Sequence, residues 1–119
     1  MTITIVLVAT GFLAMGVTAL LRPASIVAYF GTRELTVDGR NEVRAVYGGF
    51  GVAVAILLLA SLRWDALQAG IVATVAVALL GMAAGRLLSR VIDGAAGFYP
   101  WLFCAIELAA GMALLLQVA

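Results

Sequence analysis

The chain has 119 residues and a net charge of +1, and only 11% of its residues are charged, against about 25% in a typical soluble domain. Because 66% of the residues are hydrophobic and the mean hydropathy is +1.21, a soluble protein of this size could not bury its apolar surface. These values exclude a soluble globular domain and indicate that the lipid bilayer is the solvent of this protein.

The same composition limits the chemistry available to the protein. A net charge near zero, without clustered basic residues, gives no basis for nucleic-acid binding. With no histidine and a single cysteine, Cys104, the chain cannot form an internal disulfide, and a transition-metal site would rest on carboxylates alone. We therefore expect no metal and no cofactor. The sequence also contains no nucleophile triad, P-loop or dinucleotide fingerprint.

Four apolar segments are each near the roughly 20 residues that a helix needs to cross a ~30 Å hydrocarbon core. The first lacks a basic region and a convincing cleavage site, so we interpret it as a retained span and not as a signal peptide. The predicted fold is all-α, a four-transmembrane-helix bundle forming one integral membrane domain over residues 1–119. The expected spans are residues 2–21, 41–62, 66–88 and 99–118.

The connections between these spans differ in kind. Residues 63–65 form a tight turn, which makes the second and third spans an antiparallel hairpin. The first connection begins with Pro23, a favourable first-turn residue, and apolar residues follow, so we expect a short interfacial helix there. A polar turn with Asp38-Gly39 at its tip leads into the second span, and residues 89–98 form a short polar loop.

The arginines predict the orientation in the membrane. Six of them lie in or near the first and third connections, whereas only Arg63 lies in the second. The positive-inside rule then places both of those connections in the cytoplasm and both termini outside. We expect a multi-pass protein of the bacterial cytoplasmic (inner) membrane.

Small residues mark where helices can approach closely in lipid. Gly81 and Gly85 form a GxxxG pattern in the third span, and Gly48, Gly49 and Gly51 crowd the second. We expect these glycines to serve packing within the chain, and a homo-oligomer contact stays open as an alternative.

Glu107 is the most informative polar residue, because it lies inside the fourth apolar segment. An acidic residue at the centre of a spanning helix costs about 2.5–3.5 kcal/mol, so a partner, a proton or a water-filled cavity must compensate. Glu107 lies about 10 Å beyond Pro100 at 1.5 Å per residue. Arg44, Tyr47 and Arg86 come from two other spans and approach the same level, and we expect Glu107 to reach Arg44 or Arg86.

Further polar residues lie at the mouth above this level, namely Asn41, Glu42, Arg90 and Asp93. Two interpretations fit the whole set. A buried salt bridge could simply fix the register of the helices. Alternatively, carboxylate, guanidinium and phenol line a cavity that is open at one interface and closed at the other.

Three features carry a resemblance to a known family. They are the pattern Asn41-Glu-Val-Arg-Ala-Val-Tyr-Gly-Gly49, the pattern Gly85-Arg-Leu-Leu-Ser-Arg-Val-Ile-Asp-Gly94 and the mid-helix Glu107. Over nearly its whole length the chain resembles the small four-span bacterial membrane proteins called domain of unknown function 4345, which are more distantly similar to DoxX-like proteins. The resemblance implies a four-helix membrane fold and no established activity. The family's polar motif positions correspond to Asn41, Glu42, Arg44, Tyr47, Arg86, Ser89, Asp93 and Glu107.

Three functional hypotheses follow. In the first, the protein binds a lipophilic or amphipathic small molecule. Arg44 and Arg86 would hold an oxygen of it, with Tyr47, Asn41, Glu42 and Asp93 nearby, and Glu107 would be the proton donor or acceptor if the site also catalyses isomerisation, cyclisation or epoxide opening.

In the second hypothesis, the protein is a small proton-coupled transporter, although nearby arginines would hold the glutamate ionised. In the third, it is an accessory or structural subunit of a larger membrane complex. Membrane lipids are the expected surroundings in every case, and whether the chain is an enzyme stays open.

Overall fold

The computed structural model describes all 119 residues, and helices are its only regular secondary structure. Four helices are long and apolar enough to cross a membrane, which confirms the all-α prediction and indicates a multi-pass membrane protein. The elements are α1 (Thr2–Leu21), α2 (Pro23–Ala28), α3 (Val37–Val43), the π-helical segment η1 (Arg44–Gly49), α4 (Phe50–Ser61), α5 (Asp65–Asp93) and α6 (Phe98–Val118).

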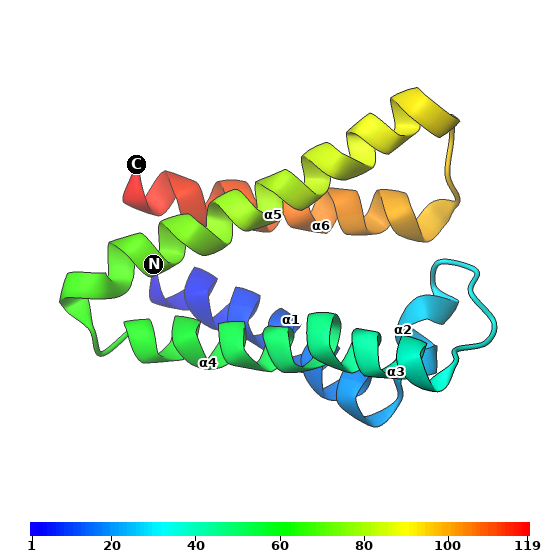
Figure 1. The fold of residues 1–119 in the computed structure, drawn as a ribbon. Helices are drawn as coiled ribbons and strands as arrows, with labels where there is room; N and C mark the ends of the chain where they lie inside the picture. The colour runs from blue at the N-terminus through cyan, green and yellow to red at the C-terminus, as the bar shows by residue number, and fades with distance from the viewer.

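The long helices form two antiparallel pairs (Figure 1). One pair consists of α1 and the continuous helix made by α3, η1 and α4, and the other consists of α5 and α6. The pairs lie close together at the end that holds both termini and the turn at residues 62–64. They separate toward the end that holds the connections 29–36 and 94–97. We call these two ends the closed half and the open half.

The closed half contains the main hydrophobic core. Ile5, Leu58, Val72 and Leu114 come from α1, α4, α5 and α6 respectively, and each is completely buried. Polar side chains strengthen this end. Gln117 Nε2 donates to Thr4 Oγ1 and so joins α6 to α1. One residue from each of the four spanning helices thus meets in a single core, which holds the two pairs together.

Close contact between α1 and its partner helix depends on glycine. A Cβ on Gly16 would lie 2.7 Å from Val52 N, and one on Gly51 would lie 3.0 Å from Phe12 O. Gly48 and Gly51 therefore pack against α1 as expected. Gly81 and Gly85 do not pack within the chain, because a Cβ on either would meet nothing within 4 Å. Their expected role in packing within the chain was wrong, since this face of α5 points outward.

The first connection holds more helix than the sequence suggested. The short helix α2 is present as expected. Asp38-Gly39, however, is not the tip of a turn but lies in the first turn of α3, where Thr36 Oγ1 accepts a hydrogen bond from Gly39 N at 3.0 Å. A side-chain acceptor at the N-cap position satisfies a free amide and starts the helix early. The second spanning helix therefore begins at Val37 and not at residue 41.

The helix α5 is also longer than the expected span 66–88. It continues to Asp93 because residues 89–93 contain no glycine or proline, and Gly94, with a φ of +86°, ends it. The predicted loop 89–98 shrinks to residues 94–97. As a consequence, Ser89 and Arg90 lie on the helix, and Arg90 lies one turn beyond Arg86.

Candidate functional site

Glu107 and Arg86 form a bidentate ion pair between α6 and α5. Arg86 Nε donates to Glu107 Oε2, and Arg86 Nη2 donates to Glu107 Oε1, each at 2.7 Å. The Glu107 side chain is only 8% exposed and the Arg86 side chain is 26% exposed. The prediction that Glu107 reaches one of two arginines is confirmed for Arg86. This pair compensates the carboxylate inside the span.

The helices around the pair hold its two members in place. Cys104 is buried one turn before Glu107, and its Sγ lies 3.7 Å from the carbonyl oxygen of Ala83 on α5. The guanidinium carbon of Arg86 lies 5.5 Å from the centroid of the Phe103 ring. Arg86 is therefore oriented by a carboxylate and by an aromatic face, both supplied by α6.

A cavity of about 650 Å³ lies between the two helix pairs in the open half, and Glu107, Arg86 and Tyr47 are among its lining residues. Of its 20 lining residues, 16 are hydrophobic, so the ion pair lies in a largely apolar wall. The volume falls within the roughly 300–1,000 Å³ of small-molecule sites, and an apolar lining with few polar groups is typical of them.

Aromatic side chains lie between the two pairs at the end of the cavity nearest the connections. The Tyr29 ring, just after α2, lies 4.8 Å from Tyr99 and 5.8 Å from Phe103. The Phe30 ring lies 6.0 Å from Phe103 and 6.5 Å from Tyr47. We expected the cavity to open at this interface. An aromatic cluster formed by Tyr29, Phe30, Tyr99 and Phe103 lines that end, and the first three of these residues are exposed.

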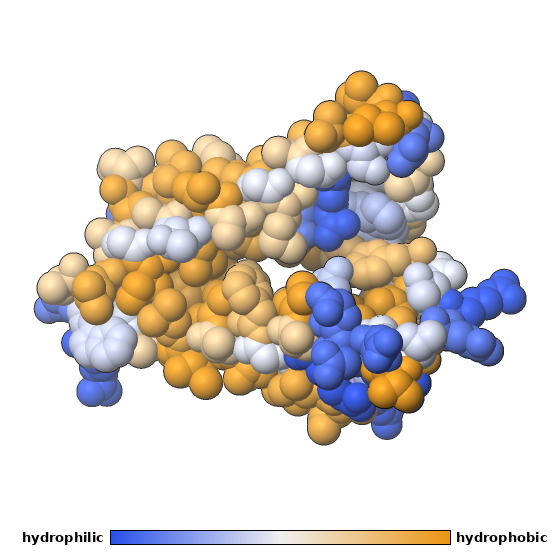
Figure 2. Space-filling model, in the orientation of Figure 1, coloured by the Kyte–Doolittle hydropathy of each residue, from blue (hydrophilic) through white to orange (hydrophobic).

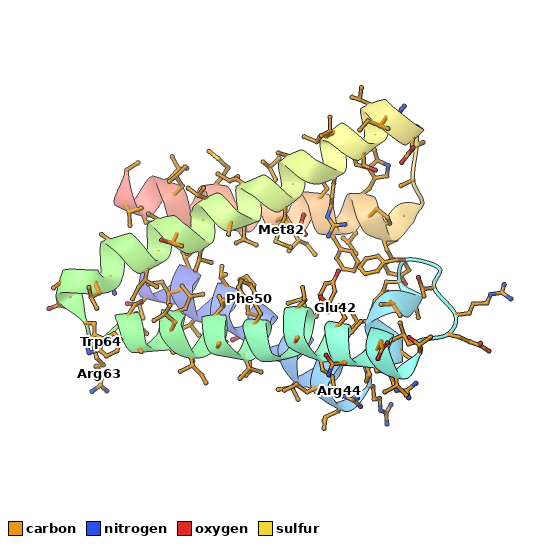
Figure 3. All side chains as sticks on the ribbon, in the orientation of Figure 1. Glu42, Arg44, Phe50, Arg63, Trp64 and Met82 are labelled. Carbon is orange, nitrogen blue, oxygen red and sulfur yellow. The ribbon has the colours of Figure 1, made fainter.

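Several exposed residues in the cavity lining lie along the spanning helices. Leu7 on α1, Met82 on α5 and Ile106 on α6 line the cavity and are 68%, 44% and 53% exposed. Figure 2 shows the hollow between the two helix pairs, and Figure 3 shows Met82 directed toward the space between them. With the helices across a bilayer, these exposed apolar residues face acyl chains. The cavity is therefore also open sideways, between the spanning helices.

Arg44 does not belong to this cavity, which corrects the sequence-based expectation. Its Nε donates to the carbonyl oxygen of Leu20 at 3.0 Å, and its side chain points away from the space between the pairs (Figure 3). Leu20 lies in the last turn of α1, where backbone carbonyls lack partners within the helix. Arg44 thus connects the end of α1 to the second spanning helix, and Arg86 is the only ion-pair partner of Glu107.

The π-helical segment η1 explains why Arg44 and Tyr47 separate. We expected both on one face because α-helical residues three apart are neighbours. A π turn closes i→i+5 hydrogen bonds and holds more residues than an α turn, so the same spacing reaches a different face. Tyr47 is turned toward the cavity while Arg44 is turned toward α1.

The remaining predicted ligand residues lie outside the cavity. Asn41, Glu42 and Asp93 are exposed and line neither it nor the smaller cavity described next. Asp93 is the last residue of α5, whereas Asn41 and Glu42 lie within the second spanning helix, which begins at Val37. The expectation that these three residues form part of the same binding site is not supported, because neither cavity has them in its lining.

A second, smaller cavity of about 230 Å³ lies beside the ion pair, where α5 ends and α6 begins. Its lining includes Arg86, Ser89 and Arg90 from α5 and Pro100 and Trp101 from α6. Arg86 therefore lines both cavities. Sequence analysis placed Arg90 only at the mouth of the site, because it assigned residues 89–98 to a loop.

The aromatic lining of the cavity was not predicted from the sequence. None of Tyr29, Phe30, Tyr99 and Phe103 was among the expected site residues. One signal was available: Tyr99, Phe103 and Glu107 follow at four-residue intervals and so share one face of α6. The aromatic partners of that face are Tyr29 and Phe30, which directly follow α2 and are distant in the sequence. The cluster itself could therefore not be recognised.

Comparison with known proteins identifies a family. A model of the family described as domain of unknown function (DUF4345) matches residues 1–118, a range that includes all four long helices and both cavities. No curated protein and no solved structure matches the chain. The resemblance carried by the segments around Arg44, Arg86 and Glu107 is thereby confirmed, and the chain belongs to the DUF4345 family.

Proposed function

We propose that this protein binds a lipophilic or amphipathic small molecule within the membrane, in the cavity between its two helix pairs. The observation that carries this proposal is the combination of an apolar space of about 650 Å³ with an ion pair in its wall. The ion pair joins α5 and α6, which pack against each other, so fixing their register would not require a cavity. The cavity lies instead between this helix pair and the other one, and Arg86 and Glu107 line it.

Arg86 is the residue best placed to recognise the ligand. A guanidinium carries five N–H donors, and two of them donate to Glu107. The other donors have no partner within the chain and can bind a carbonyl, ether or anionic oxygen of the ligand. Tyr47 adds a phenol hydroxyl that also has no partner within the chain, so it can give or accept a further hydrogen bond.

Glu107 supports this recognition by fixing the arginine. Both of its oxygens accept hydrogen bonds from Arg86, so the plane of the guanidinium is set before a ligand arrives. Proton transfer by Glu107, as in isomerisation, cyclisation or epoxide opening, would compete with these two hydrogen bonds. The geometry therefore supports binding more directly than catalysis, and it gives no separate support to a proton-coupled transporter.

The experiment fills the cavity without disturbing the fold. Gly11 on α1 lines the cavity, and a Cβ built on it meets nothing within 4 Å. Gly11→Leu should lower the amount of lipid or other small molecule that co-purifies with the protein, measured by extraction and mass spectrometry. The matched control is Gly70→Leu, which is equally free of neighbours but lies outside the cavity. Equal bound material in both variants would contradict the proposal.

We also propose a location and an orientation, namely the bacterial cytoplasmic membrane with both termini outside. The open half carries Arg22, Arg33, Arg40 and Arg90 near its connections, whereas Arg63 is the only arginine in the closed half. This distribution supports a cytoplasmic open half. Reporter fusions at Ala119 that are active only in the cytoplasm would contradict this orientation.

A further inference from the structure

We propose that the smaller cavity binds an anionic headgroup of the phosphate type, belonging to an amphipathic molecule whose apolar part occupies the larger cavity. This inference rests on the proposed function and adds the chemical class of the headgroup. Its evidence lies in Arg86, which lines both cavities, and in Ser89 and Arg90, which line only the smaller one.

The lining of the smaller cavity is positively charged. Arg86 and Arg90 lie one helical turn apart on α5, and both line it together with the hydroxyl-bearing Ser89. Arg86 is paired with Glu107, but Arg90 has no ion pair and no side-chain hydrogen bond, and Ser89 Oγ has no partner within the chain. Unpaired guanidinium and hydroxyl donors that converge on one space are suited to phosphate oxygens.

No acidic residue offsets this charge within the cavity. Glu107 accepts from Arg86 on the side of the larger cavity and does not line the smaller one. Asp93 lies three residues after Arg90, but it is exposed, forms no ion pair and is absent from the lining. The positive charge of Arg90 is therefore available to a bound anion.

The start of α6 adds a second favourable field. Gly97 precedes this helix and has no side chain to cap it, and Pro100 and Trp101 near its start line the smaller cavity. Pro100 has no backbone N–H, so the start of α6 offers this cavity the positive end of the helix dipole and not a row of free amides. Charge from α5 and the dipole of α6 thus act on the same volume.

The position of the smaller cavity agrees with an amphipathic ligand. It lies where two spanning helices meet their connection, which is the level of lipid headgroups in a bilayer, and Arg86 lines both cavities. A headgroup bound to Arg90 and Ser89 would place its apolar chains beside Arg86 and the larger cavity. A free phosphate would use only the smaller cavity.

The test compares two short-chain lipid probes that differ only in the headgroup, phosphatidylglycerol and diacylglycerol with the same acyl chains. Binding to the purified wild-type protein in neutral detergent is measured by native mass spectrometry. We expect the anionic lipid to bind at least about tenfold more tightly, the equivalent of one charge-assisted hydrogen bond. Arg90→Gln should abolish this preference and leave diacylglycerol binding unchanged, and Ser89→Ala should reduce the preference.

Arg63→Gln is the matched control, because it removes an arginine from the other end of the bundle. An unchanged preference in Arg90→Gln would overturn the proposal. Inorganic phosphate that competes as well as the lipid would also overturn it, by identifying free phosphate as the ligand. If neither Gly11→Leu nor Tyr47→Phe alters binding of either probe, the larger cavity fails as the site of the apolar part. If Gly11→Leu loses diacylglycerol binding while Tyr47→Phe retains it, the result supports the larger cavity as the site of the apolar part.

Discussion

The two halves of the bundle differ in how fully their polar side chains are hydrogen-bonded within the chain. In the closed half, polar side chains join the helices: Gln68 Nε2 donates to the carbonyl of Ser61, and Gln117 donates to Thr4. In the open half, Arg86 and Glu107 form an ion pair in the wall of a cavity, and the remaining N–H donors of Arg86 have no partner within the chain. The comparison indicates that packing in the closed half stabilises the bundle and so allows a cavity in the open half.

The largest expected effect comes from breaking the ion pair in the open half. Glu107→Gln removes one partner of a buried pair and leaves the charge of Arg86 uncompensated. The free energy of unfolding in detergent should fall by about 3 kcal/mol, the lower end for such a change, because Arg86 is partly exposed. Thermal or denaturant unfolding measures it.

The double variant Arg86→Gln with Glu107→Gln should recover part of this loss, since no lone charge remains. Glu42→Gln is the control, because Glu42 is exposed and forms no ion pair. A Glu107→Gln protein as stable as the wild type would show that the pair does not contribute to the fold.

The next effect compares truncations in the two halves. Leu114→Ala removes a completely buried side chain from the closed core and should lower stability by about 2–3 kcal/mol. Met82→Ala removes a side chain of similar size that lines the cavity and is 44% exposed, so its effect should stay below about 1 kcal/mol. Parallel unfolding measurements check this contrast. Equal losses would mean that the open half is packed as tightly as the closed half.

The smallest effect on stability is expected from Tyr47→Phe. The Tyr47 hydroxyl has no partner within the chain, so its removal should change stability by less than about 0.5 kcal/mol. If this hydroxyl binds the ligand, affinity for the diacylglycerol probe should fall by about 1–3 kcal/mol. Titration of both proteins measures the difference. Unchanged affinity would remove Tyr47 from the site and leave recognition to Arg86.

Composition and hydropathy were sufficient to predict the four spans, because only helices satisfy the backbone in lipid and their length follows from bilayer thickness. Their ends were less accurate. The Thr36 cap starts the second spanning helix early, and the absence of glycine and proline from residues 89–93 extends α5. Such local signals were present in the sequence but were outweighed there by hydropathy.

The sequence by itself determined that Glu107 needs a partner, because a lone carboxylate inside a span is unfavourable, and it narrowed the candidates to two arginines. Only the tertiary structure decided between them. The π-helical segment turns Arg44 toward the carbonyl of Leu20, while the pairing of α5 with α6 brings Arg86 to Glu107. The cavity also depends on tertiary structure, because it arises from the separation of two helix pairs, and hydropathy does not encode the angle between helices.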